Sequence, residues 1–212
     1  MPRYAAIDIG SNSIRMQAAE TGDGMATKIL AAERQVTRLG AGVFQDGRIT
    51  ADALQFVCEN LARMSQIYQK LDVIGVRAVA TSAVRDASNQ QEFLERAGKA
   101  LGAPIEIISG QEEARLIHLG VQARWPQSGK RVLMIDVGGG SAEVILSDHG
   151  VLSEAFSKPL GAVRLTEVFL RTNPPAPKRV TCRSAARILV AMPSPVSAAC
   201  MRMELLPMSM AA

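Results

Sequence analysis

Ile135-Asp-Val-Gly-Gly-Gly-Ser-Ala-Glu-Val144 is the stretch around which the chain is organised. Apolar runs at 132–135 and 144–146 lead into it and out of it, and both predict buried β-strands. The glycines between them form the turn of a hairpin, where bare backbone N–H groups surround a small concavity. Two carboxylates, Asp136 and Glu143, flank this concavity. The stretch therefore predicts a turn that binds a phosphate group and a divalent cation.

A second copy of the turn lies 128 residues upstream, at Asp8-Ile-Gly-Ser-Asn-Ser13. This copy matters because a glycine triplet alone suits any tight hairpin, whatever that hairpin binds. Strand-like segments, residues 4–8 and 14–19, flank it as well. The aligned pairs are Ile7/Ile135, Asp8/Asp136, Ile9/Val137, Gly10/Gly138 and Ser13/Ser141. A repeat at this long spacing predicts two related domains rather than a solenoid.

Strand-like and helical patterns alternate through both halves, which predicts an α/β protein. Three antiparallel strands open each half, so the sheets are expected to be mixed rather than purely parallel. Thr50 and Asn89 are the expected N-caps of the first two helices. The predicted helices cover 50–70, 89–101, 109–124 and 160–170, and the predicted strands beyond the first hairpin cover 25–35, 73–80, 105–108, 131–136, 142–147 and 151–156.

The sequence divides into three parts by its character. Residues 1–125 form the expected first domain, and residues 126–172 form the start of a second, incomplete one. Residues 173–212 contain six of the ten prolines, five of the ten methionines and no aromatic residue. A basic tail of this composition cannot bury a structured face, so we expect it to be disordered. A sharper hypothesis is a shift of reading frame near residues 173–179.

Charge and composition exclude several classes of protein. The net charge of +4 resides entirely in residues 173–212, because residues 1–172 carry 19 basic and 19 acidic side chains. This balance argues against a nucleic-acid partner. Acidic, basic or amide residues interrupt every apolar run, and the N-terminus lacks a signal-peptide pattern. The three cysteines form neither a disulfide framework nor a zinc pattern. We therefore expect a cytoplasmic protein with no membrane partner.

Four motifs, in their order along the chain, closely resemble those of the Ppx/GppA phosphatase family, which comprises exopolyphosphatases and guanosine pentaphosphate phosphohydrolases. The motifs are Asp8-Ile-Gly-Ser-Asn-Ser13, Thr81-Ser-Ala-Val-Arg85, Ile107-Ile-Ser-Gly-Gln-Glu-Glu-Ala-Arg115 and Ile135-Asp-Val-Gly-Gly-Gly-Ser-Ala-Glu143. The resemblance covers residues 4–172 and leaves the tail outside. It implies an actin-like ATPase (ribonuclease H-like) fold, in which two related halves with mixed sheets face each other across a cleft.

The resemblance also implies Mg2+-dependent hydrolysis of a phosphoanhydride. It matches Glu113 to the catalytic base that orients or deprotonates the attacking water, and it matches Asp136, Glu143 and Asp8 to carboxylates that bind the metal. The matching phosphate-binding residues are Asn12, Ser13, Arg85, Gly138, Gly139, Gly140 and Ser141.

Adjacent glutamates are expected to play different parts. Ser109 and Glu112 have the spacing of a capping box, so the Glu112 carboxylate is expected to reach back to the cap N–H. This arrangement leaves Glu113 free for the cleft. Because Glu113 lies at a helix N-terminus, we expect it to be ionised at neutral pH. The alternative is that both glutamates are solvated side chains on a helix face.

Structural alternatives exist for other polar residues. Arg85 cannot lose its charge and therefore suits phosphate oxygens, but it would also suit a surface ion pair with Asp86 or another neighbour. Asn12 would also suit a turn for conformational reasons alone. His118 is expected to pack against its apolar neighbours, and His149 is expected to be a solvated turn residue.

The function that the sequence favours is release of terminal phosphate from inorganic polyphosphate. One alternative is a guanosine pentaphosphate (pppGpp) phosphohydrolase that uses the same residues. Another is an ATPase or kinase of the same fold, and a third is an inactive fragment. The resemblance also leaves a homodimer open.

Overall fold

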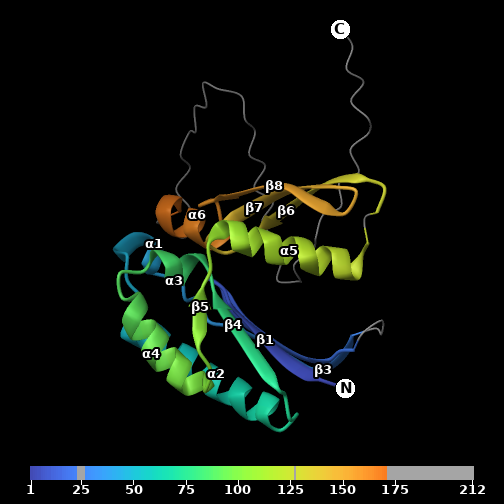
Figure 1. Cartoon of the computed structure of the whole chain (residues 1–212). Helices are drawn as coiled ribbons and strands as arrows, with labels where there is room; N and C mark the ends of the chain where they lie inside the picture. Colours follow the sequence, from blue (N-terminus) through green and yellow to red (C-terminus); the bar gives the residue numbers. More distant parts are fainter. Residues whose placement is uncertain (23–26, 127, 171–212) are drawn as a thin grey trace, which may run out of the picture.

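The computed structural model describes residues 1–22, 27–126 and 128–170 of the 212-residue chain (Figure 1). The tail predicted to be disordered lies outside these residues. The elements, in order, are β1 (Arg3–Ile9), β2 (Ser13–Glu20), β3 (Lys28–Val36), α1 (Val43–Asp46), α2 (Ala51–Gln69), β4 (Gly75–Ala80), α3 (Ser82–Asp86), α4 (Gln90–Leu101), β5 (Ile105–Ile107), α5 (Gly110–Arg124), β6 (Arg131–Val137), β7 (Ala142–Asp148), β8 (Val151–Lys158) and α6 (Ala162–Phe169). Only the short helices α1 and α3 were not predicted, because neither is long enough to show a helical period.

The first sheet has five strands in the order β3-β2-β1-β4-β5. Its first three strands are antiparallel, whereas β4 runs parallel to β1 and β5 runs parallel to β4. The prediction of a mixed sheet is therefore confirmed. Every second residue of β1, namely Ala5, Ile7 and Ile9, is buried in one apolar core that also takes in Leu61 of α2 and Phe93 of α4. These helices therefore cover one face of the sheet.

The two predicted N-caps have different outcomes. Thr50 caps α2 as expected, because its hydroxyl accepts a hydrogen bond from the Ala53 N–H at 3.2 Å. Asn89 precedes α4, but its side-chain oxygen accepts from the backbone N–H of Ile49 at 3.0 Å instead of capping the helix. Asn89 thus joins the loop before α2 to the start of α4, a long-range contact that the local spacing does not reveal.

The second sheet has the order β6-β7-β8 and is antiparallel throughout. Met134 and Ile145 form its small buried core together with Ala114 of α5. Figure 1 shows α5 running along this sheet. The division at residue 125 stays a prediction, but the apolar face of α5 packs on the second sheet although α5 precedes that boundary.

The repeated turns have the same backbone geometry. The Gly10 N–H donates to the Ser13 carbonyl at 3.0 Å, and the Gly138 N–H donates to the Ser141 carbonyl at 2.9 Å. In each turn, a Cβ added to the glycine would approach this serine oxygen to 3.1 or 3.2 Å. The internal repeat is therefore a structural one, and the two sheets that it opens form the α/β, actin-like arrangement predicted from the sequence.

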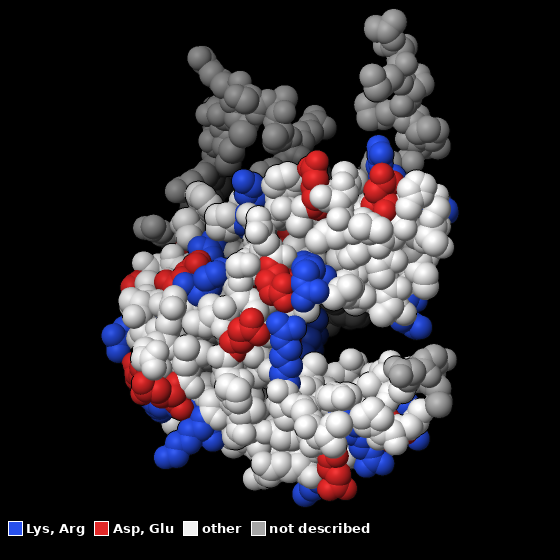
Figure 2. Space-filling view, viewed as in Figure 1, with Lys and Arg blue, Asp and Glu red and all other residues white. Residues whose placement is uncertain are grey.

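Surface charge on the described residues follows no single sign. On the face shown in Figure 2, acidic and basic side chains are interspersed, and a hollow opens between the upper and lower parts of the molecule. No helix within the described ranges is long and apolar enough to cross a membrane.

Candidate functional site

The two glycine turns meet directly. A Cβ added to Gly139 would lie 3.1 Å from the Asn12 backbone nitrogen. A Cβ added to Gly140 would lie 2.5 Å from both the Ser11 and the Ser82 hydroxyl oxygens. Only glycine fits at such distances, so the second turn packs on the first turn and on the start of α3. The structure thus brings the predicted phosphate-binding turns together.

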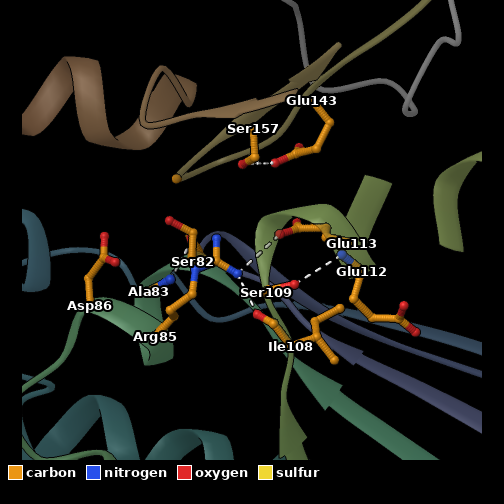
Figure 3. A network of polar contacts seen from close by, with 12 residues as sticks. Ser82, Ala83, Arg85, Asp86, Ile108, Ser109, Glu112, Glu113, Glu143 and Ser157 are labelled. Carbon is orange, nitrogen blue, oxygen red and sulfur yellow. Dashed lines mark hydrogen bonds and ion pairs between the residues drawn. The ribbon is translucent and has the colours of Figure 1, made fainter. Parts of the chain in front are cut away.

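Glu113 lies in the first turn of α5, facing Arg85 of α3 (Figure 3). Its side chain is 18% exposed, and one carboxylate oxygen lies 3.5 Å from the Arg85 guanidinium. The same guanidinium nitrogen donates to the Ile108 carbonyl at 2.6 Å, which fixes its position. Of the alternative ion pairs considered for Arg85, the one with Asp86 does not form, because Asp86 pairs with Arg164, and Arg85 pairs with Glu113 instead.

Glu112 is the structural member of the glutamate pair, but in a different way from the one expected. The Ser109 hydroxyl accepts from the Glu112 N–H at 3.1 Å, which is one half of a capping box. The Glu112 carboxylate does not return to the cap. It accepts from Arg115 at 2.7 and 2.8 Å and from Arg77 at 3.3 Å. The Arg115 hydrogen bonds, supported by Arg77, lower the pKa of Glu112 to about 2.

The environment of Glu113 raises its pKa to about 7. Burial is the main cause, because it penalises the charged carboxylate. The nearby Glu143 and Asp8 add to the shift, and Arg85 opposes it. The prediction that Glu113 is fully ionised at neutral pH is therefore wrong, since burial and carboxylate repulsion outweigh the helix N-terminus. A carboxyl group with this pKa is suited to accept a proton near pH 7.

Glu143 enters the site from β7 on the opposite side. It is 1% exposed, and it accepts a hydrogen bond from the Ser157 hydroxyl at 2.7 Å. In Figure 3 the Glu143–Ser157 pair lies across a gap from Arg85 and Glu113. Burial raises the pKa of Glu143, although hydrogen bonds from Ser157 and Ser141 partly offset the shift.

Asp8 and Asp136, the matching acids of the two turns, also lie close to each other. Burial raises the pKa of Asp8, and the Asp136 charge adds to it, while Arg15 opposes the change. The Asp8 residue nevertheless keeps a surface open to solvent. Burial likewise raises the pKa of Asp136, again against Arg15. Asp136 pairs directly across the β6–β7 ladder with Glu143, so all four acids belong to one region.

These acids fit a hard divalent cation. Mg2+ prefers oxygen ligands and commonly takes one or two carboxylates, keeping its other positions for water and substrate phosphates. Repulsion among Asp8, Asp136, Glu143 and Glu113 favours a cation beside them. Within the described ranges, however, no three acidic, histidine or cysteine side chains converge closely enough to hold a metal by themselves. The geometry therefore suits a metal that shares its ligands with substrate.

A cleft of about 470 Å³ is lined by Arg85 and Ser157, the partners of Glu113 and Glu143. Arg85 and Ser82 line it from the first half, and Ser141, Ser157 and Arg164 line it from the second. Arginine and hydroxyl groups are typical ligands of phosphate oxygens. The cleft thus has the size and the polar walls for a phosphate-containing group.

The positions of four further residues discussed in the sequence analysis can be compared with the structure. Ser13 is buried, and the Asn12 carbonyl accepts from the N–H groups of Thr37 and Arg38, both at 3.0 Å. His118 is buried with its Nε2 3.0 Å from the Ser147 hydroxyl, which confirms that it packs in the core. His149 is exposed in the β7–β8 turn, as predicted.

Three residues of the site were not predicted, namely Arg15, Ser157 and Arg164. Arg15 and Arg164 belong to a predicted strand and a predicted helix, and Ser157 follows the predicted strand 151–156. Nothing in the local pattern distinguishes them from ordinary surface residues. Arg164 has one visible signal, because it is the only basic residue between Lys158 and Arg171 in a helix with an apolar face. Its contacts with both halves become evident only in the folded chain.

Comparison with known proteins shows the family of the chain. The model of the Ppx/GppA phosphatase family matches residues 18–205. The chain belongs to this family. The match continues past residue 172, so the expectation that the family likeness ends there is wrong.

Two curated relatives of this Ppx/GppA family member carry the names of different enzymes. Exopolyphosphatase 2 of Mycobacterium tuberculosis is 37% identical over 198 residues, which cover 90% of this chain and 61% of the relative. Guanosine-5'-triphosphate,3'-diphosphate pyrophosphatase of Vibrio parahaemolyticus is 36% identical over 170 residues, covering 80% of this chain and 34% of the relative. The chain therefore spans less than two thirds of the length of either relative.

A solved structure of the family shares the fold. The crystal structure of the Aquifex aeolicus Ppx/GppA family member is 35% identical and overlays with a TM-score of 0.69. The overlay covers 82% of this chain and 56% of that protein.

Proposed function

We propose that this chain hydrolyses a terminal phosphoanhydride bond and that its substrate is inorganic polyphosphate. The observation that carries the proposal is the position of Glu113, which is partly buried near Glu143 and beside Arg85, a residue that lines the cleft. Family membership and the exopolyphosphatase relative support the same class of reaction. Because the relatives extend beyond the matched segment, activity of the chain itself is part of the proposal.

Glu113 acts as the general base in this mechanism. Its carboxylate accepts a proton from a water molecule as the water oxygen forms a bond to the terminal phosphorus. The bond between that phosphorus and the bridging oxygen breaks, and the electron pair leaves with the shortened chain. Phosphate is released, and Glu113 returns its proton to solvent. A pKa of about 7 allows both proton steps near neutral pH.

The polar groups around the cleft bind the charge that develops. Arg85 is held by the Ile108 carbonyl and presents a permanently charged guanidinium toward the base. In the second turn, phosphate oxygens accept hydrogen bonds from the N–H groups of Gly139, Gly140 and Ser141. In the first turn, Asn12 and Ser13 are the phosphate-binding residues. Donors fixed before the reaction stabilise a transition state without reorganising during it.

Asp8, Asp136 and Glu143 are the residues that would hold Mg2+ in this site. When bound, the metal supplies positive charge that neutralises phosphate oxygens. The raised pKa values of these three acids support the assignment, because burial and mutual repulsion make an uncompensated negative charge unfavourable there.

The second candidate substrate is pppGpp, and the Vibrio parahaemolyticus relative favours it. The same base and phosphate groups would serve, since the bond broken is again a terminal phosphoanhydride. Side chains that recognise a guanosine base are not among the residues assigned above. We therefore keep polyphosphate as the first candidate.

Phosphate release by the purified full chain tests both substrates. Polyphosphate, pppGpp and ATP are compared with Mg2+ and with a chelator, and the shortened polyphosphate is sized by electrophoresis. We expect Mg2+-dependent release of single phosphates from the chain ends. A folded protein that releases phosphate from neither polyphosphate nor pppGpp would overturn the proposal. Release from ATP alone would favour the ATPase alternative.

A further inference from the structure

The start of α6 holds all three carbonyls of the second glycine turn. The Ala162 N–H donates to the Gly138 carbonyl at 2.9 Å, and the Arg164 N–H donates to the Gly139 carbonyl at 3.0 Å. The Arg164 side chain completes the set, because its Nε donates to the Gly140 carbonyl at 2.7 Å. Three consecutive peptide groups therefore turn their oxygens toward α6.

The opposite side of these peptide groups carries their N–H donors. In a planar trans peptide, the C=O of one residue and the N–H of the next point in opposite directions. The N–H groups of Gly139, Gly140 and Ser141 consequently point away from α6. No backbone carbonyl within the described ranges accepts a hydrogen bond from these three groups. They are the donors that the proposed function assigns to phosphate.

Arg164 also joins this turn to the first half of the molecule. Its Nη2 donates to the Ser82 hydroxyl at 2.8 Å and forms an ion pair with Asp86, both in α3. Its guanidinium carbon lies 4.0 Å from the centre of the Phe44 ring in α1, which is a cation–π contact. One side chain, 18% exposed, thus binds the turn and two helices of the other half.

The packing around Arg164 leaves little freedom for this arrangement. A Cβ added to Gly161 would collide with the Gly139 carbonyl group and the Gly140 nitrogen, so α6 begins in direct contact with the turn. Gln45 of α1 adds a further link, because its side chain donates to the Glu167 carbonyl at 2.7 Å. The two halves are therefore in contact both at the start of α6 and near its end.

We propose that Arg164 is a positioning residue for the phosphate site. It holds the Gly140 peptide so that the Ser141 N–H faces the substrate. It also fixes the position of the second turn relative to α3, the helix that carries Ser82 and Arg85. The inference rests on the proposed function for the identity of the ligand, a phosphate group. Arg164 also lines the cleft, but its Nε and Nη2 are engaged with Gly140, Ser82 and Asp86, so the role assigned to it is to hold the turn.

Substitution of Arg164 in the full chain tests the role. Arg164→Lys keeps a cation near Phe44 and Asp86 but cannot donate to Gly140, Ser82 and Asp86 together. Arg164→Ala removes all of these contacts. Arg48→Ala is the matched control, because Arg48 forms an exposed ion pair with Glu92 away from the turn. The probe is inorganic phosphate, followed by calorimetry and by the amide NMR signals of Gly139, Gly140 and Ser141.

The wild type is expected to bind phosphate with shifts of these three signals. Both Arg164 variants are expected to bind it about tenfold more weakly or worse, the usual effect of losing a charge-assisted hydrogen bond. In turnover, KM for polyphosphate is expected to rise more than kcat falls. Methylguanidinium, at concentrations too low to denature the protein, is expected to restore part of the phosphate affinity of Arg164→Ala, a rescue that general destabilisation would not allow.

The outcomes separate this inference from the proposed function. If the wild type binds phosphate at the turn but hydrolyses nothing, the proposed function fails, while weakened binding by the Arg164 variants still supports the positioning role. If the Arg164 variants bind phosphate as tightly as Arg48→Ala, the inference is overturned. Absence of turn-signal shifts in the wild type overturns it as well. If Arg164→Ala unfolds, Arg164→Lys decides the question.

Discussion

The Arg85 guanidinium in α3 and the Glu113 carboxylate in the first turn of α5 lie 3.5 Å apart. The helices α3 and α5 follow β4 and β5, which are parallel neighbours in the first sheet. Because the carboxyl ends of parallel strands meet at one sheet edge, two segments separated in sequence deliver a cation and a base to the same place. The ion pair is partly buried, so its charges act on each other more strongly than on a fully solvated surface.

Glu113→Gln is expected to remove turnover and to retain substrate binding. The amide has the shape of the carboxyl group but cannot accept a proton from water, so kcat should fall roughly 10²- to 10⁴-fold. Glu112→Gln is the matched control, because Glu112 pairs with Arg115 and Arg77. Phosphate release and polyphosphate binding are measured for both. Turnover of Glu113→Gln at the level of Glu112→Gln would contradict the assignment of the base.

Arg85 is expected to hold down the pKa of Glu113. Burial raises this pKa to about 7, and the Arg85 charge opposes the rise, so Arg85→Met should move it further upward. Since the deprotonated base is the active form, kcat/KM should increase with pH up to the pKa and then level off. Carbon-13 NMR of the Glu113 carboxyl group in metal-free protein measures the shift directly. Arg77→Met, which affects Glu112 instead, is the control, and an equal shift in it would contradict the prediction.

Protein stability is expected to depend on pH through Glu113. Its pKa of about 7 in the folded chain is above the ordinary value of 4.5, so the folded state binds the extra proton between these values. The stabilisation is complete below pH 4.5 and is lost as the pH rises toward 7, by about 3 kcal/mol at most. The free energy of unfolding in urea at pH 5 and pH 8 measures the change. Glu113→Gln should lose less stability over this interval, and an equal loss would argue against the raised pKa.

Local sequence pattern was sufficient for most elements and for both turns. The strand–Asp–Gly–Ser pattern at Asp8 and Asp136 predicted two hairpins, and the same Gly-to-Ser backbone hydrogen bond closes each. Thr50 and Ser109 cap their helices because an N-cap hydrogen bond spans only three residues. Alternation along β1 and periodicity along α2 correspond to faces that lie in the core. These features depend on near neighbours in the chain.

Most of the errors concern groups that meet only after folding. The ionisation of Glu113 was expected from its own helix, whereas Glu143 of another sheet and burial decide its pKa. The Glu112 carboxylate was assigned to the cap, but Arg115 of the same helix binds it at 2.7 and 2.8 Å, and Arg77 of β4 adds a hydrogen bond at 3.3 Å. Arg164 had no predicted role because its partners, Ser82 and Gly140, lie 82 and 24 residues away in sequence. Contacts between residues so far apart in the chain cannot be predicted from the local sequence pattern.

Mg2+ is expected to stabilise the folded chain by reducing repulsion among the acids of the site. Binding to the folded state alone adds about 2.7 kcal/mol when the free metal is 100 times its dissociation constant. Asp136→Asn should weaken this effect, because the Asp136 charge acts on both Asp8 and Glu143. The control is Asp148→Asn at the far end of β7, where Asp148 pairs with Arg131. Differential scanning fluorimetry with Mg2+ measures both, and an equal response of the two variants would exclude Asp136 from the metal site.

Gly110→Ala is expected to disturb the site through a contact between the two halves. A Cβ at residue 110 would lie 2.5 Å from the Ser157 hydroxyl oxygen, which itself binds Glu143. Overpacking of this kind costs roughly 1–3 kcal/mol, so the unfolding free energy should fall along with turnover. Gly120→Ala on the same helix is the control, because nothing lies within 4 Å of its added Cβ, and it should gain roughly 0.5–1 kcal/mol.

A double variant identifies the colliding partner. Ser157→Gly gives the new methyl group its space, so Gly110→Ala combined with Ser157→Gly should be more stable than the sum of the two single effects predicts. Turnover should stay low in the double variant, because the hydroxyl group that donates to Glu143 is gone. Simple additivity of the two stability changes would show that the start of α5 does not press on β8, and that Ser157 reaches Glu143 independently of Gly110.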